Sequence, residues 1–247
     1  MNVPALTWRR VGLIAAGLVL TIGGMILGTI AVIGLAIAAF AAGLELSDTS
    51  FLLLSLIGVQ GIGFPLVGFV YLRYRGRRVR EFVPVRVPSL REVGVIVGGW
   101  IGALVLVGIV GVAIQVTGTT AAENQAGQII SENPGFVPYL LPFVFLLNGP
   151  GEEFLFRGVI QGQFREEFHP AAAIVLATMM FAPIHIFSLV GSLQAAAVTI
   201  GILTLPSLVF GAVYEYTDNF VVPALVHSLY NATLFGSIYL ADVATVV

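Results

Sequence analysis

Long, charge-free apolar stretches make up most of the chain, and short polar loops separate them. The longest stretch, Val11 to Leu44, exceeds the about 20 residues that cross a hydrocarbon core about 30 Å thick. It is also too long for the apolar region of a signal peptide. Further apolar segments follow at 51–72, 93–117, 136–163, 171–190, 193–214 and 220–240. This pattern predicts an all-α fold, a polytopic transmembrane bundle of about seven helices.

The composition agrees with this class and excludes others. Of 247 residues, 58% are hydrophobic and 10% are charged, whereas about a quarter of the residues in a soluble domain are charged. The formal net charge of −2 comes from sparse charges that leave no nucleic-acid footprint. The chain has no cysteine, which excludes disulfides, thiolate metal ligands and a cysteine nucleophile. We expect a multi-pass protein of the cell membrane that contacts membrane lipids and no nucleic acid.

The arginines predict how the bundle is oriented. Two arginines precede the first span, and a cluster separates the second span from the third: Arg73, Arg75, Arg77, Arg78, Arg80, Arg86 and Arg91. The loops at 45–50 and 119–135 contain no arginine. The positive-inside rule therefore places the N-terminus in the cytoplasm and the C-terminus outside. Binding of lipid or a partner is the alternative role of the cluster, although topology alone accounts for it.

Ionisable side chains enter the apolar spans only in the second half of the chain. Each such residue at the bilayer centre costs about 2.5–3.5 kcal/mol on insertion, so each calls for an explanation. The polar set is Glu152, Glu153 and Arg157 in the fourth span, His185 in the fifth, and His227 and Asn231 in the seventh. We therefore divide the chain into a three-span region at 1–135 and a region with one shared functional site at 136–247.

Helical spacing separates the two neighbouring carboxylates. Glu153 and Arg157 are four residues apart, so they share a helix face and can form an ion pair. Glu152 is rotated by about 100° from Glu153, so one carboxylate can be structural while the other points into a cavity. His227 and Asn231 are also four apart and point in one direction. Each group alone can be explained by packing, as part of a buried ion pair or of an interhelical hydrogen bond. The whole set, in contrast, predicts a shared functional site.

Other polar or helix-breaking residues give smaller expectations. Glu166 and Glu167 follow the fourth span in the predicted cytoplasmic loop, where we expect them to be solvated. The Asn-Gly-Pro-Gly run at 148–151 can open the helix just before Glu152. Pro183 is expected to bend the fifth span locally.

Three short motifs resemble those of the CAAX protease and bacteriocin-processing (CPBP, or Abi) membrane proteins. Glu-Glu-Phe-Leu-Phe-Arg at 152–157 resembles their Glu-Glu-x-x-x-Arg motif, and Phe-Ala-Pro-Ile-His at 181–185 resembles Phe-x-x-x-His. His-Ser-Leu-Tyr-Asn at 227–231 resembles His-x-x-x-Asn/Asp. Each motif alone is weak, but all three occur in order within apolar helices. The resemblance covers roughly 138–235, and it does not extend to the motif-free first three spans.

The resemblance implies an intramembrane endopeptidase related to the type II CAAX prenyl endopeptidases, with a peptide or membrane protein as substrate. It assigns the site residues in three groups: Glu152 and His185 on the hydrolytic water, His227 and Asn231 on the oxyanion, and Glu153 with Arg157 in support. The chemistry of the residue types agrees with these assignments. Hydrolysis needs a base for water, which a carboxylate supplies, and donors for the oxyanion, which imidazole and amide groups supply.

A metal and two other functions remain open. The family is commonly labelled a metalloprotease, and Glu152, His185 and His227 could be the three protein ligands of a catalytic zinc. Because the chain has no His-Glu-x-x-His helix, we favour water activated by glutamate without an obligatory metal. The alternative functions are a family member that binds or chaperones a membrane partner without cleaving it, and a proton-coupled transporter. The inverted repeats typical of transporters are not evident.

Overall fold

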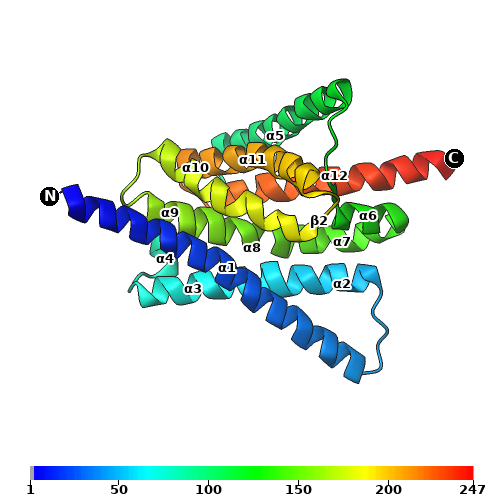
Figure 1. Ribbon diagram of the computed structural model, residues 1–247, viewed down its shortest axis with the longest axis horizontal. Helices are drawn as coiled ribbons and strands as arrows, with labels where there is room; N and C mark the ends of the chain where they lie inside the picture. Colours follow the sequence, from blue (N-terminus) through cyan, green and yellow to red (C-terminus); the bar gives the residue numbers. More distant parts are fainter. Residues whose placement is uncertain (1–2, 247) are drawn as a thin grey trace.

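The computed structural model, which describes residues 3–246, consists almost entirely of helices (Figure 1). Within this range six helices are long and apolar enough to cross a membrane, and a seventh span results if the bent pair 125–132 and 134–164 counts as one. The prediction of an all-α polytopic bundle is therefore confirmed. The two termini lie at opposite ends of the bundle (Figure 1), as an odd number of crossings requires.

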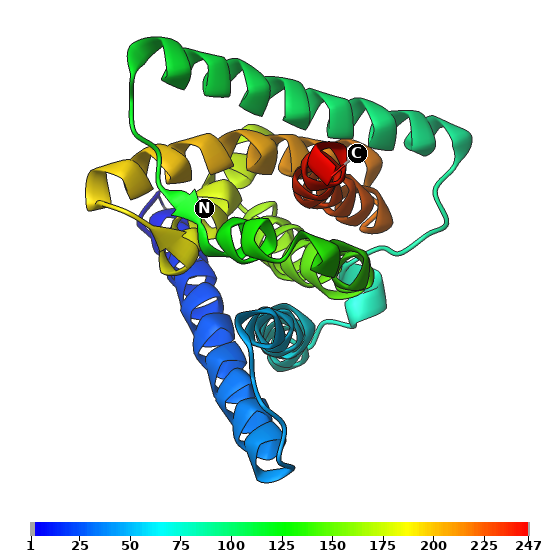
Figure 2. The same ribbon diagram turned by 90° about the vertical axis from the view of Figure 1, so that its right-hand side faces the viewer.

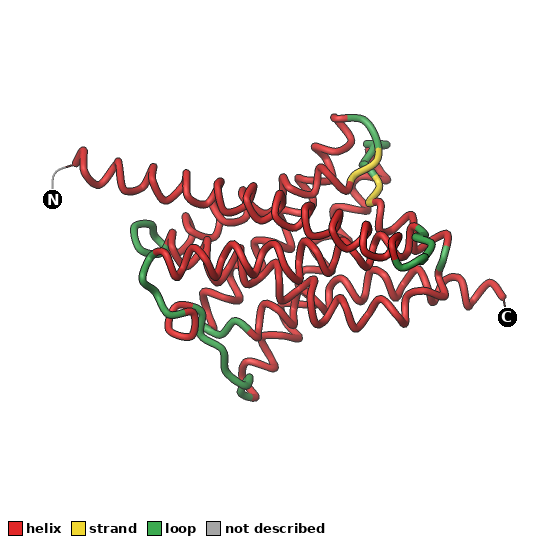
Figure 3. The backbone as a smooth tube through the Cα atoms, turned by 90° about the horizontal axis from the view of Figure 1, so that it is seen from below, coloured by secondary structure: helices red, strands yellow, loops and turns green. Residues whose placement is uncertain are grey.

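The long elements follow the predicted apolar segments closely. The second span consists of α2 (Asp48–Ser55), η1 (Leu56–Gly63) and α3 (Phe64–Tyr74). The other long elements are α1 (Val3–Ala41), α5 (Leu90–Thr117), α10 (Pro170–Phe181) with η5 (Ala182–Ser188), α11 (Leu193–Thr217) and α12 (Val221–Val246). Short elements occupy the loops: α4 (Val79–Phe82), β1 (Glu123–Asn124), α6 (Gln125–Glu132), η2 (Pro134–Phe136) and β2 (Leu189–Val190). The loops and the antiparallel β1–β2 pair lie at the helix ends (Figure 3).

The fourth span is the central element of the bundle. It consists of α7 (Val137–Phe143), η3 (Val144–Asn148), α8 (Gly149–Glu153), η4 (Phe154–Gln161) and α9 (Gly162–Phe164). On one side lie α1 and the second span, and on the other α5 covers α11 and α12 (Figure 2). One apolar core joins residues of α1, α3, η4 and α10, so packing crosses the predicted boundary at residue 135. The division into two regions stays a prediction.

The outer helices present apolar side chains to their surroundings. Along α1 the exposed positions include Ile22, Ile26, Ile30, Ile33 and Ile37, and α5 exposes Val97, Ile101, Val105, Ile109 and Val112. In water such stripes would favour aggregation, whereas lipid tails are as apolar as these side chains. The surface therefore fits contact with membrane lipid.

Residues 148–151 do not open the fourth helix. The backbone stays helical through Pro150, and π-helical turns, η3 and η4, flank the short α8 segment. Proline lacks a backbone N–H, and a local π turn is one way for a helix to accommodate the lost hydrogen bond. The two glycines instead allow close packing. A methyl group on Gly151 would lie 2.0 Å from the Gln60 carbonyl oxygen, and one on Gly149 would lie 2.2 Å from Ser228 Oγ.

This packing gives a first testable prediction. Gly151→Ala should destabilise the protein by about 1–3 kcal/mol, because the backbone of the second span must move away from the new methyl group. Gly98→Ala is the matched control, since nothing lies within 4 Å of a methyl group at that position of α5. Thermal unfolding in detergent would compare the two variants, and equal midpoints would contradict the close contact.

Ion pairs link separate segments at the end of the bundle that carries the arginine cluster. They are Arg9–Glu167 (2.8 Å), Arg75–Glu166 (2.9 Å) and Arg77–Glu166 (3.1 Å), and the Glu167 side chain is only 7% exposed. Partial burial, which would lower the pKa of Arg75, is outweighed by hydrogen bonds to Glu166 and Tyr71, so that pKa is raised. The expectation that Glu166 and Glu167 are solvated is wrong, because both carboxylates bridge separate segments.

Candidate active site

The centre of the site is His227, which lies between the two neighbouring carboxylates. His227 Nδ1 is 2.9 Å from Glu153 Oε1, and His227 Nε2 is 3.7 Å from Glu152 Oε2. The imidazole nitrogens point in different directions, so one ring can meet two carboxylates that leave their helix about 100° apart. All three side chains are at most 5% exposed. The Phe210 ring stacks on His227 at a centroid distance of 4.6 Å.

Glu153 also pairs with Arg157, as the spacing of four residues predicted. The distance from Arg157 Nε to Glu153 Oε2 is 3.1 Å, and both side chains are completely buried. Arg157 Nη2 donates hydrogen bonds to the Ser207 carbonyl oxygen and to Ser207 Oγ. The guanidinium also lies 5.1 Å from the centre of the Phe181 ring. Arginine therefore compensates the buried charge of Glu153.

The state of His227 follows from this pairing. A carboxylate that is paired with arginine can only accept hydrogen bonds, so the Nδ1–H of His227 donates a hydrogen bond to Glu153. Such a carboxylate fixes the orientation and the tautomer of an imidazole. In the neutral imidazole, Nε2 is then a bare acceptor that faces Glu152 Oε2.

Glu152 uses its two oxygens differently. Two side-chain amides donate to Oε1: Gln60 Nε2 at 3.1 Å and Asn148 Nδ2 at 3.2 Å. Asn231 Nδ2 donates to Asn148 Oδ1 at 2.6 Å, so Asn231 is connected to Glu152 through one amide. With Oε1 occupied by two donors, Oε2 is the oxygen available for proton transfer.

His185 lies apart from this cluster. Its Nδ1 is 3.2 Å from the Phe181 carbonyl oxygen, and its ring packs on the Phe181 ring at 4.8 Å. The fifth span changes after Phe181 from an α-helix to the tighter turns of η5, which contains Pro183. Among residues 3–246 no hydrogen bond or ion pair joins His185 to Glu152. The structure thus brings Glu152, Glu153, Arg157, His227 and Asn231 together and leaves His185 at the edge.

The three-ligand zinc set does not assemble in this arrangement. Within the described part of the chain, no group of three histidine, aspartate or glutamate side chains converges on a metal position. Catalytic zinc sites in proteins have three protein ligands and an open position for water. The side chains of the described residues do not fit such a site.

The sequence did not predict that Asn148 and Gln60 donate hydrogen bonds to Glu152. Asn148 precedes Glu152 by four residues, so the helical spacing places both on one face and was a usable signal. Gln60 belongs to the second span, 92 residues before Glu152. The sequence indicates this contact more weakly: Gln60 is a polar amide in an apolar span, 51–72, that contains no charged residue.

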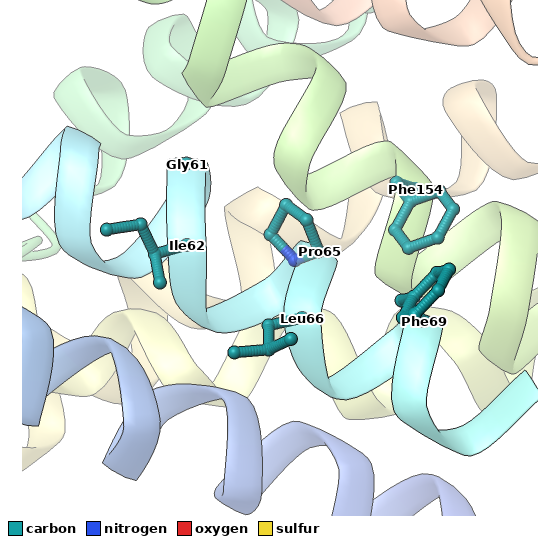
Figure 4. Close-up of a pocket in the computed structure, with 6 residues that line it drawn as sticks. All are labelled: Gly61, Ile62, Pro65, Leu66, Phe69 and Phe154. Carbon is teal, nitrogen blue, oxygen red and sulfur yellow. The ribbon is translucent and has the colours of Figure 1, made fainter. Parts of the chain in front are cut away.

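Two hollows lie beside the site, between the second and fourth spans. A groove of about 480 Å³ is lined only by apolar residues, namely Gly61, Ile62, Pro65, Leu66, Phe69 and Phe154 (Figure 4). A cavity of about 190 Å³ shares Gly61, Pro65 and Phe154 with this groove and is also lined by Gln60 and Gly151. The shared residues make the groove and the cavity neighbours, and the cavity reaches the residues next to Glu152.

Residues 134–233 match the family described as "Type II CAAX prenyl endopeptidase Rce1-like". These residues include every predicted site residue, and the matched family is the one that the three motifs resemble. The chain therefore carries an Rce1-like domain of a membrane protease family, in a multi-pass membrane protein. No curated protein and no solved structure matches the chain. Gln60 and the first three spans lie outside the matched residues, and the assignment to the cell membrane stays a prediction.

Proposed function

We propose that the protein is an intramembrane endopeptidase that hydrolyses a peptide bond near or within the membrane, with Glu152 as the general base. The observation that carries this proposal is the buried contact of Glu152 with His227, whose other nitrogen is bound to the Glu153–Arg157 ion pair. The family match supports the same reaction class.

The charges of the cluster favour one shared proton. Glu153 and Arg157 neutralise each other, and Nδ1 of His227 already donates to Glu153. If Glu152 were ionised and His227 neutral, two acceptor atoms would face each other at 3.7 Å. One proton between Glu152 Oε2 and His227 Nε2 removes this repulsion. At 3.7 Å the two atoms lie beyond hydrogen-bond distance, so exchange of a proton needs a bridging water molecule or a closer approach of the two side chains.

The reaction follows from these positions. Glu152 Oε2 takes a proton from water while the water oxygen bonds to the scissile carbonyl carbon. The carbonyl oxygen becomes an oxyanion that protonated His227 and the Asn231 amide can stabilise by hydrogen bonds. Collapse of the intermediate breaks the C–N bond, and the proton on Glu152 passes to the leaving amine. The role of His185 in activating water stays a prediction; its Nδ1 is engaged with the Phe181 carbonyl oxygen, which leaves Nε2 for that role.

The adjoining groove supports a substrate with an apolar segment. Its lining residues carry no charge, so an apolar chain can lie there in place of lipid tails. The peptide part would then reach the cavity lined by Gln60 and Gly151. We propose no identity for the substrate beyond this class.

Hydrolysis of a quenched-peptide library by the purified protein tests the proposal. Cleavage should be present in wild type and lost in Glu152→Gln, and a parallel reaction with a chelator separates glutamate-activated water from metal-dependent hydrolysis. If the two proteins give the same trace, the proposal fails. Retained biological activity in Glu152→Gln would then favour a binding or chaperone role, and proton uptake by proteoliposomes that the same substitution abolishes would favour transport.

A further inference from the structure

One contact to Glu152 comes from outside the matched domain. Gln60 lies in η1 of the second span, and its Nε2 donates to Glu152 Oε1 over 3.1 Å. The family match begins at residue 134, so neither the family nor the three motifs assign this residue a role. The first half of the chain thus supplies part of the immediate surroundings of the proposed base.

Local backbone geometry turns Gln60 toward the fourth span. Residues 56–63 form π-helical turns between two α-helical segments, and the wider turn changes which side chains face the neighbouring helix. Such insertions are frequent at functional sites. Gly151 lets the Gln60 backbone approach α8, because any larger residue would collide with the Gln60 carbonyl oxygen. The site is therefore built by two irregular helices that meet at Glu152.

Packing alone does not explain a glutamine at this position. Its Oε1 is buried and has no hydrogen-bond partner within residues 3–246. A buried acceptor without a partner lowers stability, whereas an apolar side chain of the same shape would carry no such penalty. The glutamine is therefore better explained by its Nε2 group, which donates a hydrogen bond to Glu152.

We propose that Gln60 is a positioning residue for Glu152. Together with Asn148 it occupies Oε1, and this fixes the carboxylate plane so that Oε2 is presented to His227 and to the water. The kinetic consequence rests on the proposed function, but the hydrogen bond itself does not. The first three spans then act as part of the site and not only as a membrane anchor.

Gln60→Met tests the proposal because methionine has a similar length and no donor. We expect kcat to fall by about 10- to 100-fold, the effect of losing one hydrogen bond to a charged group. KM should change by less than about threefold, because Gln60 acts through the base and not through substrate binding. Unchanged kcat, or a change confined to KM, would overturn the assignment.

Gln161→Met is the matched control. Gln161 is fully buried, whereas Gln60 is half-buried; like Gln60, it donates one hydrogen bond from Nε2, to the Gly211 carbonyl oxygen, and has a buried Oε1 without a partner in the described structure. It does not contact Glu152 in the described structure. This variant should lose stability without the specific loss of kcat, so an equal loss of kcat in both variants would show that Gln60 is merely structural.

An infrared experiment separates this inference from the proposed function. The difference spectrum between wild type and Glu152→Gln isolates the bands of the Glu152 carboxyl group, and the same subtraction in the Gln60→Met background shows whether they move. We expect a shift, because loss of a donor changes the C–O stretching frequencies. If wild type cleaves no peptide, the proposed function fails, but the band shift still shows whether Gln60 donates a hydrogen bond to Glu152. An unchanged band would refute the contact.

Discussion

Glu152→Gln is expected to lower kcat for peptide hydrolysis by about 10²- to 10⁴-fold, the usual contribution of general acid–base catalysis. The substitution should remove the base with little disturbance of the surroundings. The new carbonyl oxygen can still accept hydrogen bonds from Gln60 and Asn148, as Oε1 does now. The new NH₂ group would face Nε2 of His227, which in the neutral imidazole can accept a hydrogen bond from it. We therefore expect an unchanged thermal midpoint together with the loss of turnover.

Glu132→Gln is the matched control for this measurement. Glu132 is an exposed carboxylate at the end of α6, so its substitution should leave both kcat and stability unchanged. Turnover by purified protein and thermal unfolding in the same detergent would be measured for both variants. Wild-type turnover in Glu152→Gln would exclude Glu152 as the base.

Most of the fold could be predicted from the sequence, because a membrane imposes a simple rule. Each span needs an uninterrupted apolar run, and the runs in this chain correspond to the observed long helices. The loop at 119–135 was the main omission, since it contains the short helix α6, which is bent by 103° from the next segment. A helix of eight residues is too short for a membrane span and gave no apolar run to detect.

The site could be predicted only where it depends on local spacing. The pair Glu153–Arg157 lies within one helix, and a separation of four residues sufficed to predict it. The position of His227 between two carboxylates depends on how α12 packs against α8, and no short-range pattern contains that information. His185 could not be placed either, because its direction depends on the tighter turns after Phe181.

The second large effect is expected at Arg157. Arg157→Met would leave Glu153 buried without its cation, and breaking a buried ion pair in this way destabilises proteins by about 3–5 kcal/mol. Both side chains are fully buried, so water cannot replace the guanidinium. Arg157→Met should therefore unfold at a much lower temperature than wild type, and its turnover should fall because the charge next to His227 is no longer balanced.

The double variant Arg157→Met/Glu153→Gln distinguishes stability from catalysis. Removing both charges should recover most of the thermal midpoint that Arg157→Met loses, because no buried charge is then left without its partner. Turnover should stay low, because the amide at position 153 has no negative charge to stabilise protonated His227. Thermal unfolding and peptide hydrolysis of the two single variants and the double variant would measure both effects. If the double variant regains turnover along with stability, the Glu153–Arg157 pair is structural and contributes nothing to the state of His227.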